Sequence, residues 1–278
     1  MTENLTPETG RNSRAREYVY APANMIAERL YNRLHMTANM ATIIGGLGVS
    51  ATALYASQII PDNPDLSHRV AITASYGFFL LFDLLDGRIA EVMKRQHVVR
   101  NEETGVLLDT GADRWQELFT FGSHMAIASA MGNEWGVLTA ALAASLRPLT
   151  ALTRARAERK RIFVDEIPND PIGFWGNRTG SAIAGFAGLV APEIRGFNLQ
   201  MWGDLAVATG TGVTAIRRYF NGNNVDKMIT DEQLAQMDET TRNRALFEFR
   251  IAHKKERLMQ IALASSIAAT TLSYLALK

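Results

Sequence analysis

MTANMATIIGGLGVSATALYASQII, residues 36–60, is the stretch that decides the fold class. It carries no charged side chain, and a helix needs about 20 mostly apolar residues to cross a bilayer. A helix also satisfies its own backbone hydrogen bonds, which lipid cannot do. The stretch therefore predicts a membrane-spanning helix.

Five further apolar windows follow along the chain, at 70–85, 105–131, 136–153, 179–191 and 199–216. A last window, 258–277, is only moderately apolar, and it is open whether it forms a seventh span, an interfacial helix or a dimer-packing helix. We expect an all-α polytopic membrane protein with six transmembrane helices, an N-terminal amphipathic surface helix and a C-terminal helical extension.

Lysines and arginines are sorted along the chain in agreement with this topology. They crowd the segment before the first window and the connections after the second, fourth and sixth. Of the other three connections, the first contains only Arg69, the second contains no lysine or arginine, and the third contains only Arg195. The positive-inside rule then places both termini on the cytoplasmic side of an integral membrane protein, which we expect in the cell inner membrane.

The overall composition excludes several classes of protein. The absence of cysteine excludes disulfide scaffolds, thiolate metal sites and cysteine nucleophiles. Because 29 Lys+Arg stand against 28 Asp+Glu, the charge gives no reason to expect a nucleic-acid partner. The mean hydropathy of −0.04 is typical of a soluble protein, but the average hides the segregation of apolar and charged residues.

Three parts of the chain differ in composition. Residues 1–35 are polar, with an amphipathic stretch that can lie on the cytoplasmic lipid surface or pack on the membrane domain. Residues 36–220 hold the six windows and would form the catalytic domain. Residues 221–278 would form a polar helical linker followed by the C-terminal apolar helix.

Four aspartates stand where the second and third windows meet. Asp83 and Asp86 share one helical face with Gly87 and Ala90, and Asp109 and Asp113 share one face with Gly105. Ionisable residues in membrane helices are costly and indicate function. Four carboxylates in one poorly solvated place require cations, and two Mg²⁺ or Mn²⁺ ions would neutralise them. We therefore predict a two-metal site that faces the cytoplasm.

These residues resemble the signature of the CDP-alcohol phosphotransferase family, DxxDGxxAR followed by GxxxDxxxD. The chain reads DLLDGRIAE at 83–91 and GVLLDTGAD at 105–113, with five more residues between the halves than the family pattern has. TANMAT (37–42) and TRARAE (153–158) are similar to other family segments. Glu91 stands where the family has an arginine, and Arg95, one turn later, is a candidate substitute. The resemblance does not cover residues after about 221.

The resemblance implies transfer of a phosphatidyl group from a CDP-linked lipid to an alcohol, with release of CMP. By the family pattern the four aspartates hold two metal ions, and Asp113 is also the general base. Gly87, Ala90 and Gly105 would border the nucleotide. The same likeness suggests a homodimer within membrane lipids.

Basic residues on the same membrane face would select the acceptor, a small alcohol or sugar phosphate. Arg154, Arg156 and Arg178 are candidates for binding an acceptor phosphate, as similar arginines do in members that use inositol phosphate. Arg147 lies deeper, and its candidate partners are Glu117 and a lipid phosphate. The glycines of GGLG (45–48) lie inside an apolar window and indicate close helix packing rather than a phosphate loop.

Two rival functions stay open. A divalent-cation transporter would also carry aspartates in its spans, although broken helices and carboxylates near mid-membrane would then be expected. A non-catalytic relative of the family is suggested by Glu91. A soluble prenyl-diphosphate enzyme would need two distant DDxxD-like runs, which are absent from the sequence.

Overall fold

The structure is a computed structural model that describes residues 13–62, 65–98, 102–162, 178–193, 198–223 and 228–276. Within these ranges the regular structure is helical, and Ile162 and Met228 form an isolated antiparallel bridge. The helices are α1 (Ser13–Leu34), α2 (Ala38–Ile59), α3 (Leu66–Arg95), α4 (Glu102–Ala130), α5 (Glu134–Arg159), α7 (Arg178–Val190), α8 (Leu199–Asn221), α9 (Asp231–Gln236) and α10 (Glu239–Ala276), with a short 3₁₀ turn at Ile60–Asp62.

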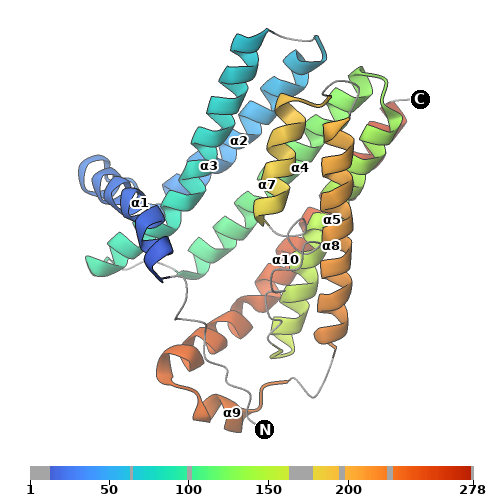
Figure 1. The fold of residues 1–278 in the computed structure, drawn as a ribbon. Coiled ribbons are helices and arrows are strands. Elements are labelled where there is room, and N and C mark those ends of the chain that lie inside the picture. Colours follow the sequence, from blue (N-terminus) through green and yellow to red (C-terminus); the bar gives the residue numbers. More distant parts are fainter. Residues whose placement is uncertain are drawn as a thin grey trace.

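Each of the six apolar windows forms a helix, namely α2, α3, α4, α5, α7 and α8 in order (Figure 1). Three spans among the described residues are long and apolar enough to cross a membrane, at Ala38–Asp62, Leu66–Arg95 and Glu134–Arg159. The segment Gly180–Val190 is apolar but shorter. The all-α fold is therefore confirmed, and the count of six spans stays a prediction.

Helix α2 occupies the centre of the part of the bundle that carries the aspartates. It packs against both α3 and α4, while α5 packs against α4, α8 and α10. Its buried face is built from small residues such as Gly45, Gly46 and Gly48, which let neighbouring helices approach closely. A side chain on Gly48 would overlap the ring of Phe79, since an added Cβ would lie 2.0 Å from that ring. The GGLG stretch is thus a packing element, as predicted.

Helix α1 lies across the end of α3. Ala23 and Ala27 are buried against Ile89 and Val92 of α3, whereas Met25, Ile26 and Leu34 are exposed. A position on the lipid surface agrees with this pattern and stays a prediction.

A buried histidine–aspartate pair joins three helices at a distance from the aspartate-rich ends. His124 Nδ1 of α4 lies 2.8 Å from Asp204 Oδ1 of α8, and His124 Nε2 lies 2.9 Å from the Gly185 carbonyl oxygen of α7. Both side chains are fully buried. The lone aspartate of the sixth window is therefore accounted for by a structural contact.

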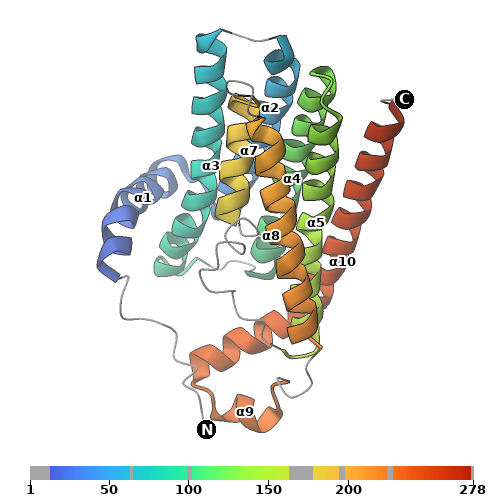
Figure 2. The ribbon, with the colours of Figure 1, turned by 45° about the vertical axis from the view of Figure 1, so that its right-hand side comes forward.

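Helix α10 is one continuous helix of 38 residues that runs beside α5 (Figure 2). It crosses the expected boundary at residue 258 without a break. Its N-terminal part lies near α9, and its C-terminal part reaches the opposite end of the bundle (Figures 1 and 2). This course joins the polar segment after residue 238 to the apolar tail as one rigid element.

Candidate active site

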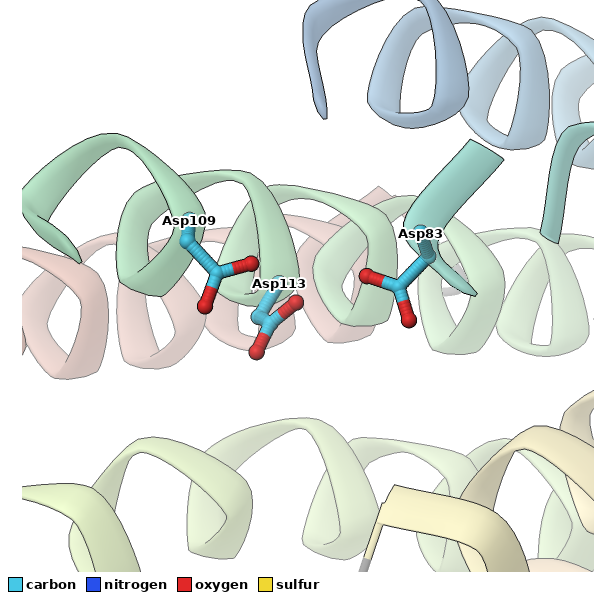
Figure 3. Close-up of side chains that lie close together, drawn as sticks. All are labelled: Asp83, Asp109 and Asp113. Carbon is cyan, nitrogen blue, oxygen red and sulfur yellow. The ribbon is translucent and has the colours of Figure 1, made fainter. Parts of the chain in front are cut away.

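Three carboxylates from two helices converge in the bundle. Asp83 comes from α3, and Asp109 and Asp113 come from successive turns of one face of α4 (Figure 3). One oxygen of each lies within 4.8 Å of the others, and all three side chains are partly buried. The structure thus brings together three of the four predicted metal ligands.

A pair of adjacent glycines in α2 sets the distance between these carboxylates. A Cβ added to Gly45 would lie 3.1 Å from Phe82 Cβ and 3.2 Å from the Phe79 carbonyl oxygen of α3, beside Asp83. A Cβ added to Gly46 would lie 3.6 Å from Ala112 Cβ of α4, between Asp109 and Asp113 in sequence. Neighbouring residues on a helix point about 100° apart. Gly45 therefore lies against α3, and Gly46 lies against α4.

The donor set of this cluster suits a hard divalent cation. Carboxylate oxygens are the ligands that Mg²⁺ and Mn²⁺ prefer. Like charges this close, in a partly buried place, are unfavourable unless a cation compensates them. Arg114 Nη2 lies 4.0 Å from Asp113 Oδ2, and the same arginine is shared with Glu117. The residues present therefore fit the predicted metal.

A cavity of about 390 Å³ adjoins the cluster. Its lining residues are Thr42, Asp86, Gly87, Glu102, Gly105, Val106, Asp109 and Phe247, and we call it the donor cavity. Asp109 belongs to both the cluster and the cavity. Gly87 faces open space, since an added Cβ would meet no atom within 4 Å. The predicted residues Asp86, Gly87 and Gly105 thus line the same cavity.

Asp86 is held at this cavity by a residue that the sequence did not single out as a ligand or binding residue. Thr42 Oγ1 of α2 donates a hydrogen bond to Asp86 Oδ2 at 2.6 Å. Asp86 lies outside the group of three close carboxylates. The available signal was the final threonine of TANMAT, which the family resemblance includes without a stated role.

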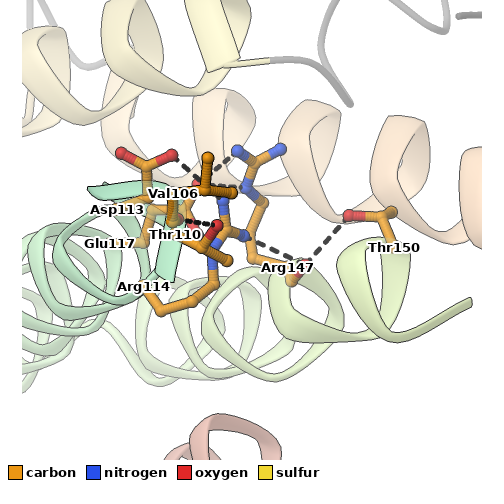
Figure 4. A network of polar contacts seen from close by, with 7 residues as sticks. All are labelled: Val106, Thr110, Asp113, Arg114, Glu117, Arg147 and Thr150. Carbon is orange, nitrogen blue, oxygen red and sulfur yellow. Dashed lines mark hydrogen bonds and ion pairs between the residues drawn. The ribbon is translucent and has the colours of Figure 1, made fainter. Parts of the chain in front are cut away.

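A buried ionic network lies one turn beyond Asp113 (Figure 4). Arg147 Nε of α5 donates to Glu117 Oε1 at 2.7 Å, and Arg114 Nη1 pairs with Glu117 Oε2 at 2.5 Å. Arg114 also donates to the Arg147 carbonyl oxygen at 3.2 Å. Of the two partners predicted for Arg147, Glu117 is the one observed. Two guanidinium groups on one carboxylate leave positive charge beside the acidic cluster and fix α4 against α5.

Two of the predicted nucleotide-binding residues, Ala90 and Arg95, are not among the residues that line the donor cavity. Ala90 packs against the cluster formed by α1, α2 and α3. Arg95 Nη1 lies 3.3 Å from Glu28 Oε1 of α1, with both side chains largely exposed. Glu91, which replaces the family arginine, pairs with Arg88 at 3.1 Å. The structure therefore does not bring Arg95 to the cavity wall.

Two of the three predicted acceptor residues, Arg154 and Arg156, lie at the end of α5. Arg154 Nε donates to Glu158 Oε1 at 2.8 Å, and Arg156 Nε donates to Glu256 Oε1 of α10 at 3.0 Å. Arg156 also lines a second cavity, of about 290 Å³, together with Arg159, Lys160 and Arg218. Arg178 begins α7, and its side chain lies outside the described residues.

Glu256 is the acidic member of this otherwise basic cavity. Burial raises the pKa of its carboxyl group, but hydrogen bonds from Arg159 and Arg156 outweigh burial and hold the pKa below its ordinary value. Arg159 Nη1 donates to Glu256 Oε2 at 2.8 Å. Each carboxylate oxygen of Glu256 therefore accepts a hydrogen bond from one arginine, and these bonds hold α10 against the end of α5.

Comparison with known proteins gives a fold but no sequence relative. No family model and no curated protein matches the chain. The phosphatidylinositol phosphate synthase of Mycobacterium tuberculosis with CDP-DAG bound is 21% identical, with a TM-score of 0.56 over 75% of this chain and 98% of that one. The same enzyme in complex with manganese and citrate is 20% identical, with a TM-score of 0.55 over 76% and 97%. The chain shares the fold of these structures.

Proposed function

We propose that this chain, which has the fold of phosphatidylinositol phosphate synthase, is an integral-membrane CDP-alcohol phosphatidyltransferase. The observation that carries the proposal is the convergence of Asp83, Asp109 and Asp113 beside a cavity that shares Asp109. The solved neighbour with this fold has CDP-DAG bound. A CDP-linked lipid donor and an alcohol acceptor are the substrates that this combination supports.

Asp83, Asp86, Asp109 and Asp113 would hold two divalent ions, Mg²⁺ or Mn²⁺. When bound, such ions supply positive charge that compensates the donor diphosphate and the charge on the departing CMP. The carboxylates of three of these residues already point into one space. Manganese is present in one solved structure with this fold, which supports the choice of metal.

Asp113 would act as the general base. The acceptor oxygen forms a bond to the lipid-side phosphorus of the donor, the bond from that phosphorus to the CMP oxygen breaks, and the hydroxyl proton passes to the Asp113 carboxylate. The Glu117–Arg147 pair one turn away holds this part of α4 in place. Correct placement matters because the attacking oxygen must approach in line with the leaving group.

The nucleotide would lie in the donor cavity against Gly87 and Gly105, where the lack of side chains leaves room for it. Ala90 and Arg95 remain proposed members of this site. The acceptor phosphate would bind Arg154, Arg156 and Arg178, of which Arg156 lines the second cavity. The pattern of cations supports a cytoplasmic active site and N-terminus, and a homodimer remains part of the proposal.

The test uses the purified full chain with CDP-diacylglycerol, Mg²⁺ or Mn²⁺, and a panel of alcohols and sugar phosphates. We expect CMP release and one lipid product, with activity reduced by at least about a thousandfold in Asp113→Asn. Asp62→Asn is the matched control, since Asp62 is exposed in the turn after α2. No CMP release with any acceptor contradicts the proposal; a transporter would give this result, and a non-catalytic relative would bind donor without turnover.

A further inference from the structure

An aromatic side chain from the C-terminal helix forms part of the donor cavity. Phe247 of α10 lines this cavity with Thr42 of α2, Asp86 of α3 and Asp109 of α4. Its side chain is partly buried. Among the described residues that line the cavity, Phe247 is the aromatic one. The wall of the site is therefore built from four helices, one of them far along the chain from the aspartate motif.

The part of α10 around Phe247 is firmly docked. Ala245, Ile251, Ala252 and Met259 are completely buried on its inner face. Helix α10 packs against both α5 and α4, and the Leu258 side chain lies 3.8 Å from a Cβ added to Gly111. Buried contacts on both sides of Phe247 fix its position relative to Asp109.

Ion pairs hold the same segment to the first turn of α4 and to the end of α5. Lys254 pairs with Glu103 in the first turn of α4, next to the cavity residue Glu102. Glu256 binds Arg156 and Arg159 near the end of α5. These contacts join the wall at Phe247 to α5 and to α4, the helix that carries two of the three clustered aspartates.

The surroundings of Phe247 suit an anionic, planar ligand. The Arg250 guanidinium lies over the Phe247 ring, 5.4 Å from its centroid. This arrangement places a positive charge beside the aromatic residue of a cavity whose other described lining residues supply mainly carboxylates and glycines. A pyrimidine nucleotide presents both a flat base and phosphates, and aromatic side chains bind bases by stacking.

We infer that Phe247 is a nucleotide-binding residue, stacking on the base of the CDP-linked donor, so that α10 completes the donor site. This inference rests on the proposed function for the identity of the nucleotide. It assigns the C-terminal helix a part in substrate binding, which neither the apolar pattern nor the aspartate motif indicates.

The experiment compares Phe247→Ala, Phe247→Leu and Phe247→Trp with the wild-type chain. Stacking on one base is worth about 1–3 kcal/mol, so Phe247→Ala should raise both the KM for CDP-diacylglycerol and the Kd for CMP with Mn²⁺ by about tenfold. The kcat at saturating donor should stay near that of the wild type. Tryptophan should restore binding to within about twofold, and leucine should not.

Leu246→Ala is the matched control, because Leu246 is the preceding residue of α10 and is 45% exposed. The thermal midpoint of unfolding is measured for every variant, so that a loss of stability can be told apart from a loss of binding. Unchanged CMP affinity in Phe247→Ala, or full restoration by leucine, overturns the inference. The binding assay needs no turnover: CMP binding that depends on Phe247 without any transfer contradicts only the proposed function, and no CMP binding by the wild type contradicts both.

Discussion

Arg147 Nε donates a hydrogen bond to Glu117 Oε1 at 2.7 Å, which places an ion pair between α5 and α4 in the interior of the bundle. Arg147 is 3% exposed. Because Arg114 also binds Glu117, one carboxylate compensates two guanidinium groups. The pair lies one helical turn from Asp113, so the position of the proposed base depends on a buried electrostatic contact.

Removal of the shared carboxylate should therefore destabilise the protein more than removal of either arginine. In Glu117→Ala the buried Arg147 and the partly buried Arg114 both lose the Glu117 carboxylate, at a cost of about 3–5 kcal/mol in the free energy of unfolding. Arg147→Ala leaves Glu117 paired with Arg114 and should cost less. Reversible denaturation in mixed micelles measures both values. Arg161→Ala, which removes an exposed pair with Asp231, is the control and should cost at most about 1 kcal/mol.

Gly45→Ala should loosen the aspartate cluster. The added methyl group would press on Phe82 Cβ and the Phe79 carbonyl oxygen of α3, and such overpacking costs about 1–3 kcal/mol. As α3 moves, Asp83 should draw away from Asp109, and the affinity for Mn²⁺ should fall. Gly77→Ala is the control on α3, because an added Cβ there meets no atom within 4 Å. Equal Mn²⁺ affinity in both variants would contradict this account of the glycine pair.

Neutralising one carboxylate should have opposite effects with and without metal. In Asp109→Asn without metal, the loss of repulsion within the cluster should raise the thermal midpoint. In the wild type, Mn²⁺ at about a hundred times its Kd should add about 2.7 kcal/mol of stability, and Asp109→Asn should lose most of this gain. Melting curves measured with Mn²⁺ and with a chelator test both expected changes in the thermal midpoint. An aspartate cluster that merely faces water would show neither effect.

Glu256 should contribute stability that depends on pH. Its pKa is held below the ordinary value of 4.5 by Arg159 and Arg156 despite burial. A lowered pKa in the folded state stabilises the protein above the pKa of the unfolded state, and this stability is lost as the pH falls through the folded pKa. Glu256→Gln should therefore be less stable than the wild type at pH 7 and should converge with it below pH 4.5. Glu232→Gln, at an exposed position of α9, is the control.

The helices and the aspartate cluster could be predicted from the sequence because both leave local patterns. A charge-free run such as 36–60 indicates a helix by itself, and the spacing of Asp109 and Asp113 places them on one face. The pairing of Arg147 with Glu117 was among the predicted alternatives, since a deep cation needs an anion. The aspartates and Arg147 are charged residues in apolar segments, and a charged side chain inside a membrane needs an opposite charge or a polar partner.

Other parts of the site depend on packing between distant segments and left no local pattern. Periodicity does not tell which helix lies between two others, so the place of α2 against both α3 and α4 was not predicted. Thr42 belongs to the TANMAT segment, but its contact with Asp86 follows from that packing. Phe247 stands in a polar stretch that resembled a linker, and its place at the cavity follows from the docking of α10. Arg95 lies one turn after Glu91 and pairs with Glu28 in the structure, so its contact with the nucleotide stays a prediction.

The continuity of α10 from Glu239 to Ala276 has a mechanical consequence. Because an uninterrupted helix is stiff, a tilt or rotation of one end moves the other end as well. The cavity residue Phe247 and the tail that reaches the far side of the bundle belong to the same helix (Figure 2). A change in lipid thickness, or a neighbouring protein, that tilts the tail would therefore also move Phe247 relative to the cavity that it lines.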